Sequence, residues 1–292
     1  MTHREFDVAN EVHRAVAAVR IDASLACATI EQIAEEAPIA LVYNGVPHVV
    51  VMASPVNLED LALGFSLSEA LIGSPAELGG IEIVPEQTGY SVYLSVPPER
   101  AAIIEQRRRN MTARTGCGLC GAETIEQAMR DVPKVTAGRG VIAGRGVTAG
   151  RGVTRHAMAA AMKQLPSLQT LNAATGATHA AAWANFNGRL QLVREDVGRH
   201  NALDKLIGAL AAGGIDTAQG FAVITSRASY EMVQKAAMAG IGLLAAVSAP
   251  TALAVRIARE AGVTLAGFVR GERCMVYADK AHRLTTSDDW KA

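Results

Sequence analysis

Two cysteines with the spacing C-x-x-C are the residues of this chain best placed to do chemistry. Cys117 and Cys120 lie in the glycine-rich stretch TGCGLCGAE, which covers residues 115–123. The thiolate form of cysteine binds metals and attacks sulfur atoms. Such a pair can hold a metal ion, cycle between a dithiol and a disulfide, or carry a sulfur atom.

The sequence offers few further ligands for a metal site. A structural zinc site needs four ligands, usually supplied as two pairs. The seven histidines show no H-x₃₋₅-H spacing and are scattered at positions 3, 13, 48, 156, 179, 200 and 282. A zinc deaminase would carry H-x-E and P-C-x-x-C motifs, whereas two alanines follow His179 and Gly116 precedes Cys117. We therefore expect no protein-bound metal.

Thioredoxin-like chemistry has partial support. A redox C-x-x-C motif usually follows a buried strand and begins a helix, whose N-terminus lowers the thiol pKa. The residues before the motif, EQRRRNMTARTG (105–116), are polar and basic and do not form an apolar strand. A helix could still begin after it, at AETIEQAMR (122–130). A dithiol oxidoreductase therefore stays open as an alternative.

A sulfur carrier needs a thiol with a lowered pKa, access to partners, and a mobile tether. Arginines at positions 107, 108, 109 and 114 lie close in sequence to the cysteines and favour the thiolate. The pentapeptide AGRGV occurs three times, at 137–141, 143–147 and 149–153. Three short repeats rich in glycine and arginine cannot bury a core, so they predict a flexible insert. The sequence meets the requirements of sulfur carriage without excluding the alternatives.

Charge is distributed unevenly along the chain. The net charge is zero, yet residues 107–155 hold nine arginines and one lysine against three acidic residues. Such a run can be a solvated basic loop, or it can create a local positive field that attracts an anionic ligand or partner. Both interpretations stay open at this point.

The chain divides into three predicted parts. Residues 1–109 predict an α+β lobe, with two strands joined at the turn dipeptide Asn44-Gly45 and a helix that Asn57 could cap. Residues 110–155 form the basic loop with the C-x-x-C motif and the AGRGV repeats. Residues 156–292 predict an α/β lobe, in which a hairpin that turns at Asn187-Gly188 precedes alternating helices and strands. That alternation predicts crossover units and a mixed, largely parallel sheet.

The α/β lobe predicts a ligand site at its strand ends. In open α/β sheets, ligands bind beyond the carboxyl ends of the strands, where helix N-termini present free N–H groups. The residues expected at these ends are 226–229 (SRAS), 248–251 (SAPT) and 270–273 (RGER). Serine and threonine also cap helices, but guanidiniums at adjoining strand ends favour an anion pocket that includes Ser226 and Arg227.

Other polar residues have simpler structural interpretations. We expect one group of charged residues to cap and brace a helix that begins near Asn201, and not to transfer protons: Glu195, Asp196, Arg199, His200 and Asp204. His179 lies in an apolar run and is expected to be a core or pocket histidine. Cys27 and Cys274 are expected to be ordinary buried or half-buried residues.

Several long blocks of the chain resemble the FdhD/NarQ family of formate dehydrogenase accessory sulfurtransferases. The resemblance runs from about Ala40 to the C-terminus and rests on five blocks in the family's order: NLEDLALGFSLSEALI, RTGCGLCGAE, TGATHAAAW, EDVGRHNALDKLIG and TSRASYEMVQKAAMAGIGLLAAVSAPTALAV. The AGRGV insert is the one departure, and it disturbs no motif.

The resemblance implies a specific function. Family members take sulfur from a cysteine desulfurase as a cysteine persulfide. They pass it to the molybdenum cofactor that bears two molybdopterin guanine dinucleotides (Mo-bis(molybdopterin guanine dinucleotide)), before that cofactor enters formate dehydrogenase. The family has a cytidine-deaminase-like α/β fold without the zinc chemistry. Carried over, Cys117 holds the persulfide and Cys120 is its partner.

The resemblance also implies a cofactor-binding segment near the C-terminus, where a guanine nucleotide could occupy the same pocket: Phe268, Val269, Arg270, Gly271, Glu272 and Arg273. This segment overlaps one of the strand ends predicted from topology. A chaperone that binds the cofactor without moving sulfur is a further alternative.

The cellular setting is predicted from composition. No apolar run reaches the roughly 18–20 residues needed to cross a bilayer, the N-terminus lacks a secretory apolar segment, and four cysteines in 292 residues do not form a disulfide framework. We therefore expect a cytoplasmic protein without membrane or nucleic-acid partners. Because two-fold dimers are the commonest oligomers, a homodimer is expected.

Overall fold

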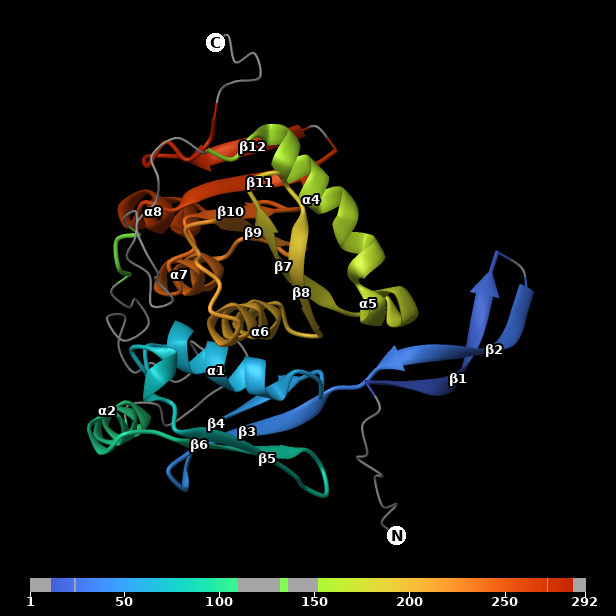
Figure 1. Cartoon of the computed structure of the whole chain (residues 1–292). Coiled ribbons are helices and arrows are strands. Elements are labelled where there is room, and N and C mark those ends of the chain that lie inside the picture. The colour runs from blue at the N-terminus through green and yellow to red at the C-terminus, as the bar shows by residue number, and fades with distance from the viewer. Residues whose placement is uncertain (1–11, 24, 110–131, 136–151, 272, 286–292) are drawn as a thin grey trace.

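Three β-sheets and the helices around them account for the described part of the chain (Figure 1). The computed structural model describes residues 12–23, 25–109, 132–135, 152–271 and 273–285. Cys117, Cys120 and residues 136–151, which include most of the AGRGV repeats, lie outside them. Among the described residues, no helix is both long and apolar enough to cross a membrane.

The described N-terminal part contains a two-stranded hairpin, a four-stranded sheet, two α-helices and a 3₁₀ helix, η1 (Pro75–Glu77). The four strands lie in the order β4-β3-β6-β5, with β3 and β6 parallel and the other pairs antiparallel. The elements are β1 (His13–Asp22), β2 (Leu25–Ala34), β3 (Ala37–Tyr43), β4 (Val46–Ala53), α1 (Leu58–Ser68), β5 (Gly80–Pro85), β6 (Tyr90–Ser95) and α2 (Pro98–Arg109).

The C-terminal part is built on a six-stranded mixed sheet in the order β12-β11-β10-β9-β7-β8. Strands β9, β10 and β11 are parallel, and antiparallel strands flank them on both sides. The elements are α4 (Arg155–Leu168), α5 (Thr170–Thr175), β7 (His179–Asn185), β8 (Leu190–Asp196), α6 (Arg199–Ala212), β9 (Gly220–Ile224), α7 (Tyr230–Met238), β10 (Leu243–Ala246), α8 (Ala252–Ala261), β11 (Thr264–Arg270) and β12 (Arg273–Ala278).

Helices cover both faces of the six-stranded sheet, which explains why its central strands are almost wholly apolar. Alternate residues point to opposite faces. Trp183 and Ile224 join the core formed with α6, α7 and α8. Phe221 and Val223 join a second core, formed with α4 on the other face. The first core continues through α1 into the four-stranded sheet.

Close contact between α1 and α6 joins the two parts of the core, and two glycines make it possible. A Cβ added at Gly64 would lie 1.7 Å from the backbone oxygen of Asp204. A Cβ added at Gly208 would lie 1.9 Å from the backbone oxygen of Asp60. Each helix therefore carries a glycine where the other helix's backbone approaches. The predicted division of the chain into three parts, with boundaries after residues 109 and 155, stays a prediction.

The structure confirms some local predictions and corrects others. Asn44 and Gly45 form the predicted turn, with φ angles of 47° and 80°. Asn57 precedes α1 but its side chain makes no capping hydrogen bond, so the predicted cap was wrong. Helix α6 begins at Arg199, before the predicted start near Asn201. Cys27 is exposed, contrary to the expected burial, and Cys274 is half-buried as expected.

Candidate functional site

The carboxyl ends of β9, β10 and β11 meet at one edge of the six-stranded sheet, which we call the carboxyl edge. The amide of Ala228 donates to the carbonyl oxygen of Ala249 at 3.3 Å, and the amide of Thr251 donates to that of Ala228 at 3.1 Å. The amide of Phe268 donates to the carbonyl oxygen of Ser248 at 3.2 Å. The three predicted strand-end segments therefore lie side by side.

Ser226 and Arg227 follow β9 and differ in their exposure. Ser226 is buried, and its hydroxyl donates to the backbone oxygen of Arg227 at 3.0 Å. The side chain of Arg227 is exposed. Of these two predicted residues, Arg227 therefore exposes its side chain at the carboxyl edge, whereas the Ser226 side chain is turned into the loop.

The predicted segment 268–273 has alternating exposure at the turn between β11 and β12. Phe268 has a φ of 51° at a break in the strand register, and 41% of its side chain is exposed. Val269 is buried in the core beneath α4. A non-glycine residue in the left-handed region is uncommon in a strand and often marks a functional constraint. The irregular backbone turns the Phe268 ring outward.

Two arginines flank the turn that follows Phe268. Arg270 is exposed, and its Nε donates to the backbone oxygen of Val247 at 3.1 Å, so its guanidinium lies across the end of β10. Gly271 has a φ of 54°, and Arg273 is exposed and pairs with Arg270 across the hairpin. Glu272 lies outside the described residues. This turn gives the carboxyl edge two cationic side chains.

A second polar group extends the carboxyl edge where β7 and α6 begin. Because β7 runs antiparallel to β9, its first residue, His179, lies near the end of β9. Burial lowers the pKa of His179, and the nearby charges of Arg199 and His200 lower it further. The Nε atom of Arg199 is buried and has no hydrogen-bond partner among the described residues.

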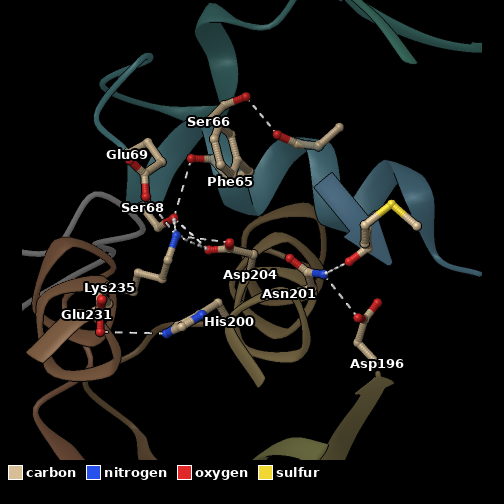
Figure 2. A network of polar contacts seen from close by, with 12 residues as sticks. Phe65, Ser66, Ser68, Glu69, Asp196, His200, Asn201, Asp204, Glu231 and Lys235 are labelled. Carbon is tan, nitrogen blue, oxygen red and sulfur yellow. Dashed lines mark hydrogen bonds and ion pairs between the residues drawn. The ribbon is translucent and has the colours of Figure 1, made fainter. Parts of the chain in front are cut away.

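Glu231 connects this group to the start of α7. Its carboxylate accepts a hydrogen bond from the Ser229 hydroxyl at 2.8 Å. Figure 2 shows Glu231 facing His200, and the carboxylate lies 3.7 Å from His200 Nε2. Contact with His200 and the bond from Ser229 lower the pKa of Glu231 to about 2. Glu231 is therefore a negative charge at neutral pH beside the His200 ring, whose buried Nε2 makes no hydrogen bond among the described residues.

The expected bracing of α6 is confirmed for Asp196, whereas the carboxylate of Glu195 braces α5 instead. Asp196 lies 2.6 Å from the buried Nζ of Lys205 and accepts from the amide of Ser54 at 3.0 Å. Glu195 accepts from the amides at the start of α5, with distances of 2.9 Å to Leu171 and 2.8 Å to Asn172. These carboxylates are saturated by structural contacts. Arg199 and His200 instead belong to the carboxyl edge.

Asp204 and Lys235 form a buried ion pair between α6 and α7. Figure 2 shows Lys235 Nζ between Asp204, Ser68 and Glu69, with distances of 2.9 Å to Asp204 Oδ2 and 2.9 Å to Glu69 Oε1. Burial alone would lower the pKa of Lys235, but the charges of Asp204 and Glu69 outweigh it and raise the pKa. This pair braces the helices that carry His200 and Glu231.

The described residues at the two ends of the repeat segment, Val135 before it and Val153 at its last position, lie at the opposite, amino edge of the sheet. The amide of Val135 donates to the carbonyl oxygen of Ala261, where α8 ends, at 2.7 Å. The amide of Val153 donates to the carbonyl oxygen of Arg283 at 2.8 Å, and Arg283 Nη2 donates to that of Val135 at 3.0 Å. The two described flanks are thus held close together by Arg283.

The chemistry available at the carboxyl edge is anion binding. The N-termini of α7 and α8 open toward it, and exposed guanidiniums surround it. No group of three or more histidine, cysteine, aspartate or glutamate side chains among the described residues could hold a metal ion. An aromatic ring beside these cations suits a nucleotide, whose base can stack while its phosphates bind arginine.

Sequence reasoning found the strand ends but missed His179 and Arg199 as members of this edge. Their placement depends on β7 pairing with β9, a contact between strands separated by β8 and α6 in the sequence. The hairpin pattern of β7 and β8 is the signal that could have found them. A hairpin that precedes parallel strands can pair alongside the outermost of them, which here is β9.

Comparisons with known proteins agree on one family. The family model described as FdhD/NarQ family matches residues 34–285. A relative from Bordetella petrii, named sulfur carrier protein FdhD, is 51% identical over 248 residues, which are 85% of this chain and 85% of the relative. A relative of the same name from Xanthomonas euvesicatoria pv. vesicatoria is 53% identical over 248 residues, covering 85% of this chain and 84% of the relative.

A solved structure has the same fold. It is a formate dehydrogenase accessory protein from Desulfotalea psychrophila, which matches with a TM-score of 0.71 and 23% identity over 94% of this chain and 100% of that chain. The resemblance inferred from the motifs and the mixed α/β fold class are both confirmed.

Proposed function

Because the chain belongs to the FdhD/NarQ family, we propose that it is a sulfur carrier required for formate dehydrogenase activity. In this proposal a cysteine desulfurase supplies sulfur as a persulfide to Cys117, with Cys120 as its partner. The acceptor is Mo-bis(molybdopterin guanine dinucleotide), before it enters formate dehydrogenase. The name of the curated relatives, sulfur carrier protein FdhD, supports the transfer of sulfur.

The proposed uptake step is a thiol–persulfide exchange. The Cys117 thiolate attacks the terminal sulfur of the desulfurase persulfide. A new S–S bond forms on Cys117, and the S–S bond of the donor breaks, so that the donor cysteine leaves as a thiolate. The arginines near Cys117 in the sequence favour its thiolate form. No metal or external oxidant enters this step.

The observation that carries the proposal is the composition of the carboxyl edge. Arg227, Arg270 and Arg273 are exposed around the loops that follow the parallel strands. The cofactor brings two guanine dinucleotide ends, and each carries phosphates that bidentate guanidiniums and helix N-termini bind well. The exposed Phe268 ring is available to stack on a guanine base. We propose this edge as the place where the cofactor binds.

Sulfur labelling tests the proposed function. The protein is incubated with a cysteine desulfurase and cysteine and then weighed intact by mass spectrometry. We expect the wild type to gain at least one sulfur atom and Cys117→Ala to gain none. Cys27→Ala is the matched control, because Cys27 is an exposed thiol outside the motif. It should label like the wild type.

A cofactor-binding chaperone that moves no sulfur would rest on the same carboxyl edge. It predicts no labelling of the wild type at Cys117. Equal labelling of the wild type and Cys117→Ala would overturn the sulfur carrier and leave the chaperone as the better account.

A further inference from the structure

Three nitrogen-bearing side chains converge where β7 and α6 begin, at the other end of the carboxyl edge from the β11–β12 turn. They are His179, the first residue of β7, and Arg199 and His200, the first two residues of α6. Burial lowers the pKa of His179, and the charges of Arg199 and His200 lower it further, so the three side chains share one neighbourhood. We call them the inner cluster. The function proposed above gives them no role.

Two nitrogen atoms of the inner cluster are buried without a hydrogen-bond partner. They are Arg199 Nε and His200 Nε2, and neither has a partner among the described residues. A buried polar atom without a partner costs folding free energy, so native proteins nearly always satisfy it with protein, water or a ligand. Two such atoms on neighbouring side chains indicate that a polar group from outside the chain completes them.

The helix that carries Arg199 and His200 begins without a side-chain cap. Helix α6 is 14 residues long, and its N-cap residue, Gly198, has no side chain to accept from the first amides. The first turn holds no acidic residue. Arg199 and His200 instead add positive charge to the positive end of the helix dipole, which is unfavourable in the absence of an anion. The start of α6 is therefore suited to a negatively charged ligand.

The nearby carboxylates do not neutralise the inner cluster. Asp196 is buried and lies 2.6 Å from the Nζ of Lys205, so its charge is balanced there. Figure 2 shows Glu231 beside His200, at 3.7 Å from its Nε2, so Glu231 offsets the charge of that ring. Among the described residues, no ion pair joins a carboxylate to Arg199. Its guanidinium is the uncompensated cation of the inner cluster.

The inner cluster lies some distance from the exposed ring of Phe268. In the strand order β12-β11-β10-β9-β7-β8, three strand spacings separate the end of β11 from the start of β7. At about 4.8 Å per spacing, this is roughly 14 Å along the carboxyl edge. The β11–β12 turn offers a ring on which a base can stack, whereas the half-buried inner cluster offers nitrogen atoms that suit a compact group with several oxygens.

We propose that the inner cluster is a diphosphate subsite, in which Arg199 and His200 contact the terminal phosphate of a guanine nucleotide and His179 lines the inner wall. A nucleotide that stacks its base on Phe268 extends its phosphates along the carboxyl edge, away from the ring. The first phosphate lies nearer the ring, and the second reaches the start of α6. The subsite deepens the function proposed above and rests on it only for the identity of the ligand.

Calorimetric titration of the full-length protein with GMP and GDP tests the subsite. We expect the wild type to bind GDP at least about tenfold more tightly than GMP, because only the second phosphate reaches the inner cluster. Arg199→Gln should bring this ratio close to one and leave the affinity for GMP within about twofold of the wild type. Arg199→Lys should restore part of the ratio, because it keeps the charge but loses the planar fork.

Helix α4 supplies a matched control. Arg155 is also half-buried, is also the first residue of a 14-residue helix, and is also followed by a histidine. Its helix begins at the amino edge and is capped, because the Thr154 hydroxyl accepts from the amide of Ala157 at 3.0 Å. Arg155→Gln should bind GMP and GDP like the wild type. Thermal melts of Arg155→Gln and Arg199→Gln should both stay near the wild-type melting temperature.

Pyrophosphate alone separates the subsite from the function proposed above. If the wild type binds pyrophosphate and Arg199→Gln does not, the subsite stands even where Cys117 takes up no sulfur or GDP does not bind. Three results would overturn it. They are a wild type that binds neither pyrophosphate nor GDP, an Arg199→Gln protein that keeps the wild-type ratio of GDP to GMP affinity, and an Arg155→Gln protein that is weakened as strongly as Arg199→Gln.

Discussion

Individual buried charges at the centre of this protein are arranged to hold the carboxyl edge in place. Lys235 contacts Asp204, Ser68 and Glu69, and its Nζ lies 5.4 Å from the centroid of the Phe65 ring. Burial raises the pKa of Asp204, and the charge of Lys235 and the bond from Ser68 oppose that rise. The two residues stabilise each other's charged forms in a site closed to water.

Removing one partner of this pair should be costly. We expect Lys235→Met to lower the free energy of unfolding by about 3–5 kcal/mol near neutral pH, because it leaves Asp204 buried without its counter-charge. Without Lys235 the folded-state pKa of Asp204 rises further above its unfolded value. A carboxyl group with a raised folded-state pKa destabilises the fold at pH values above its unfolded-state pKa. The loss in free energy of unfolding therefore becomes smaller as the pH falls.

Chemical denaturation at several pH values measures this effect. The double variant Lys235→Met/Asp204→Leu is the control and should recover much of the loss, since it leaves no uncompensated charge. A loss for the single variant that is small, or that grows as pH falls, would contradict the assigned ion pair.

Residue types alone showed which side chains could bind anions, but not how they point. The sequence predicted Arg270 and Arg273 as ligand contacts, and both are exposed. It could not show that Val269 faces the core or that Ser226 bonds its neighbour. These details follow from the register break at Phe268 and the path of the loop after β9, which tertiary packing determines.

Among the elements, the pair α1 and α6 connects the two parts of the core. Contact between helix backbones at this distance requires glycine in both helices, at Gly64 and Gly208. An ion pair lies at each end of this helix contact. At one end, Asp60 of α1 pairs with Arg194 of β8, whose Nε lies 2.7 Å from Asp60 Oδ2. At the other end lies the pair of Asp204 and Lys235. The crossing therefore fixes the start of α6, where Arg199 and His200 lie.

The single methyl group added by Gly64→Ala should force α1 and α6 apart. In an isolated helix, glycine to alanine is stabilising by about 1 kcal/mol. Gly64→Ala should nevertheless destabilise this protein by at least about 2 kcal/mol, because its Cβ would lie 1.7 Å from a backbone oxygen that cannot rotate away. Thermal and denaturant melts of the purified variant measure the loss.

Gly80→Ala is the matched control, since a Cβ there meets no atom within 4 Å. It should change stability by less than about 0.5 kcal/mol. A Gly64→Ala protein as stable as the wild type would show that the α1–α6 contact is looser than described.

Element prediction succeeded where the periodicity was strong and the turn residues were diagnostic. The alternation from β9 to β11 and the turns at Asn44-Gly45 and Asn187-Gly188 were readable because apolar runs and Asn-Gly pairs signal them. The β1–β2 hairpin was missed, since its described turn residue, Ala23, adopts a φ of 43° that alanine rarely takes. Helix α4 was missed as well, and it contains Pro166.

At the scale of the whole molecule, four separate stretches of chain come together at the carboxyl edge, beside the first residue of β7, His179. Residues after β8, β9, β10 and β11 come together because β7 runs antiparallel to β9 while β9, β10 and β11 run parallel. The sequence predicted three of these stretches from the crossover pattern. The fourth, with Arg199 and His200, required the strand order, which no local pattern encodes.

Guanine nucleotide binding tests the central claim most directly, because the account places the nucleotide ends of the cofactor at this edge. Titration calorimetry with GDP is run on the wild type, on Arg270→Glu, and on Lys280→Glu, an exposed charge reversal after β12 at the amino edge. We predict that Arg270→Glu weakens binding about tenfold or more and that Lys280→Glu leaves it unchanged. Wild-type affinity in Arg270→Glu, or no binding by the wild type, would contradict the account.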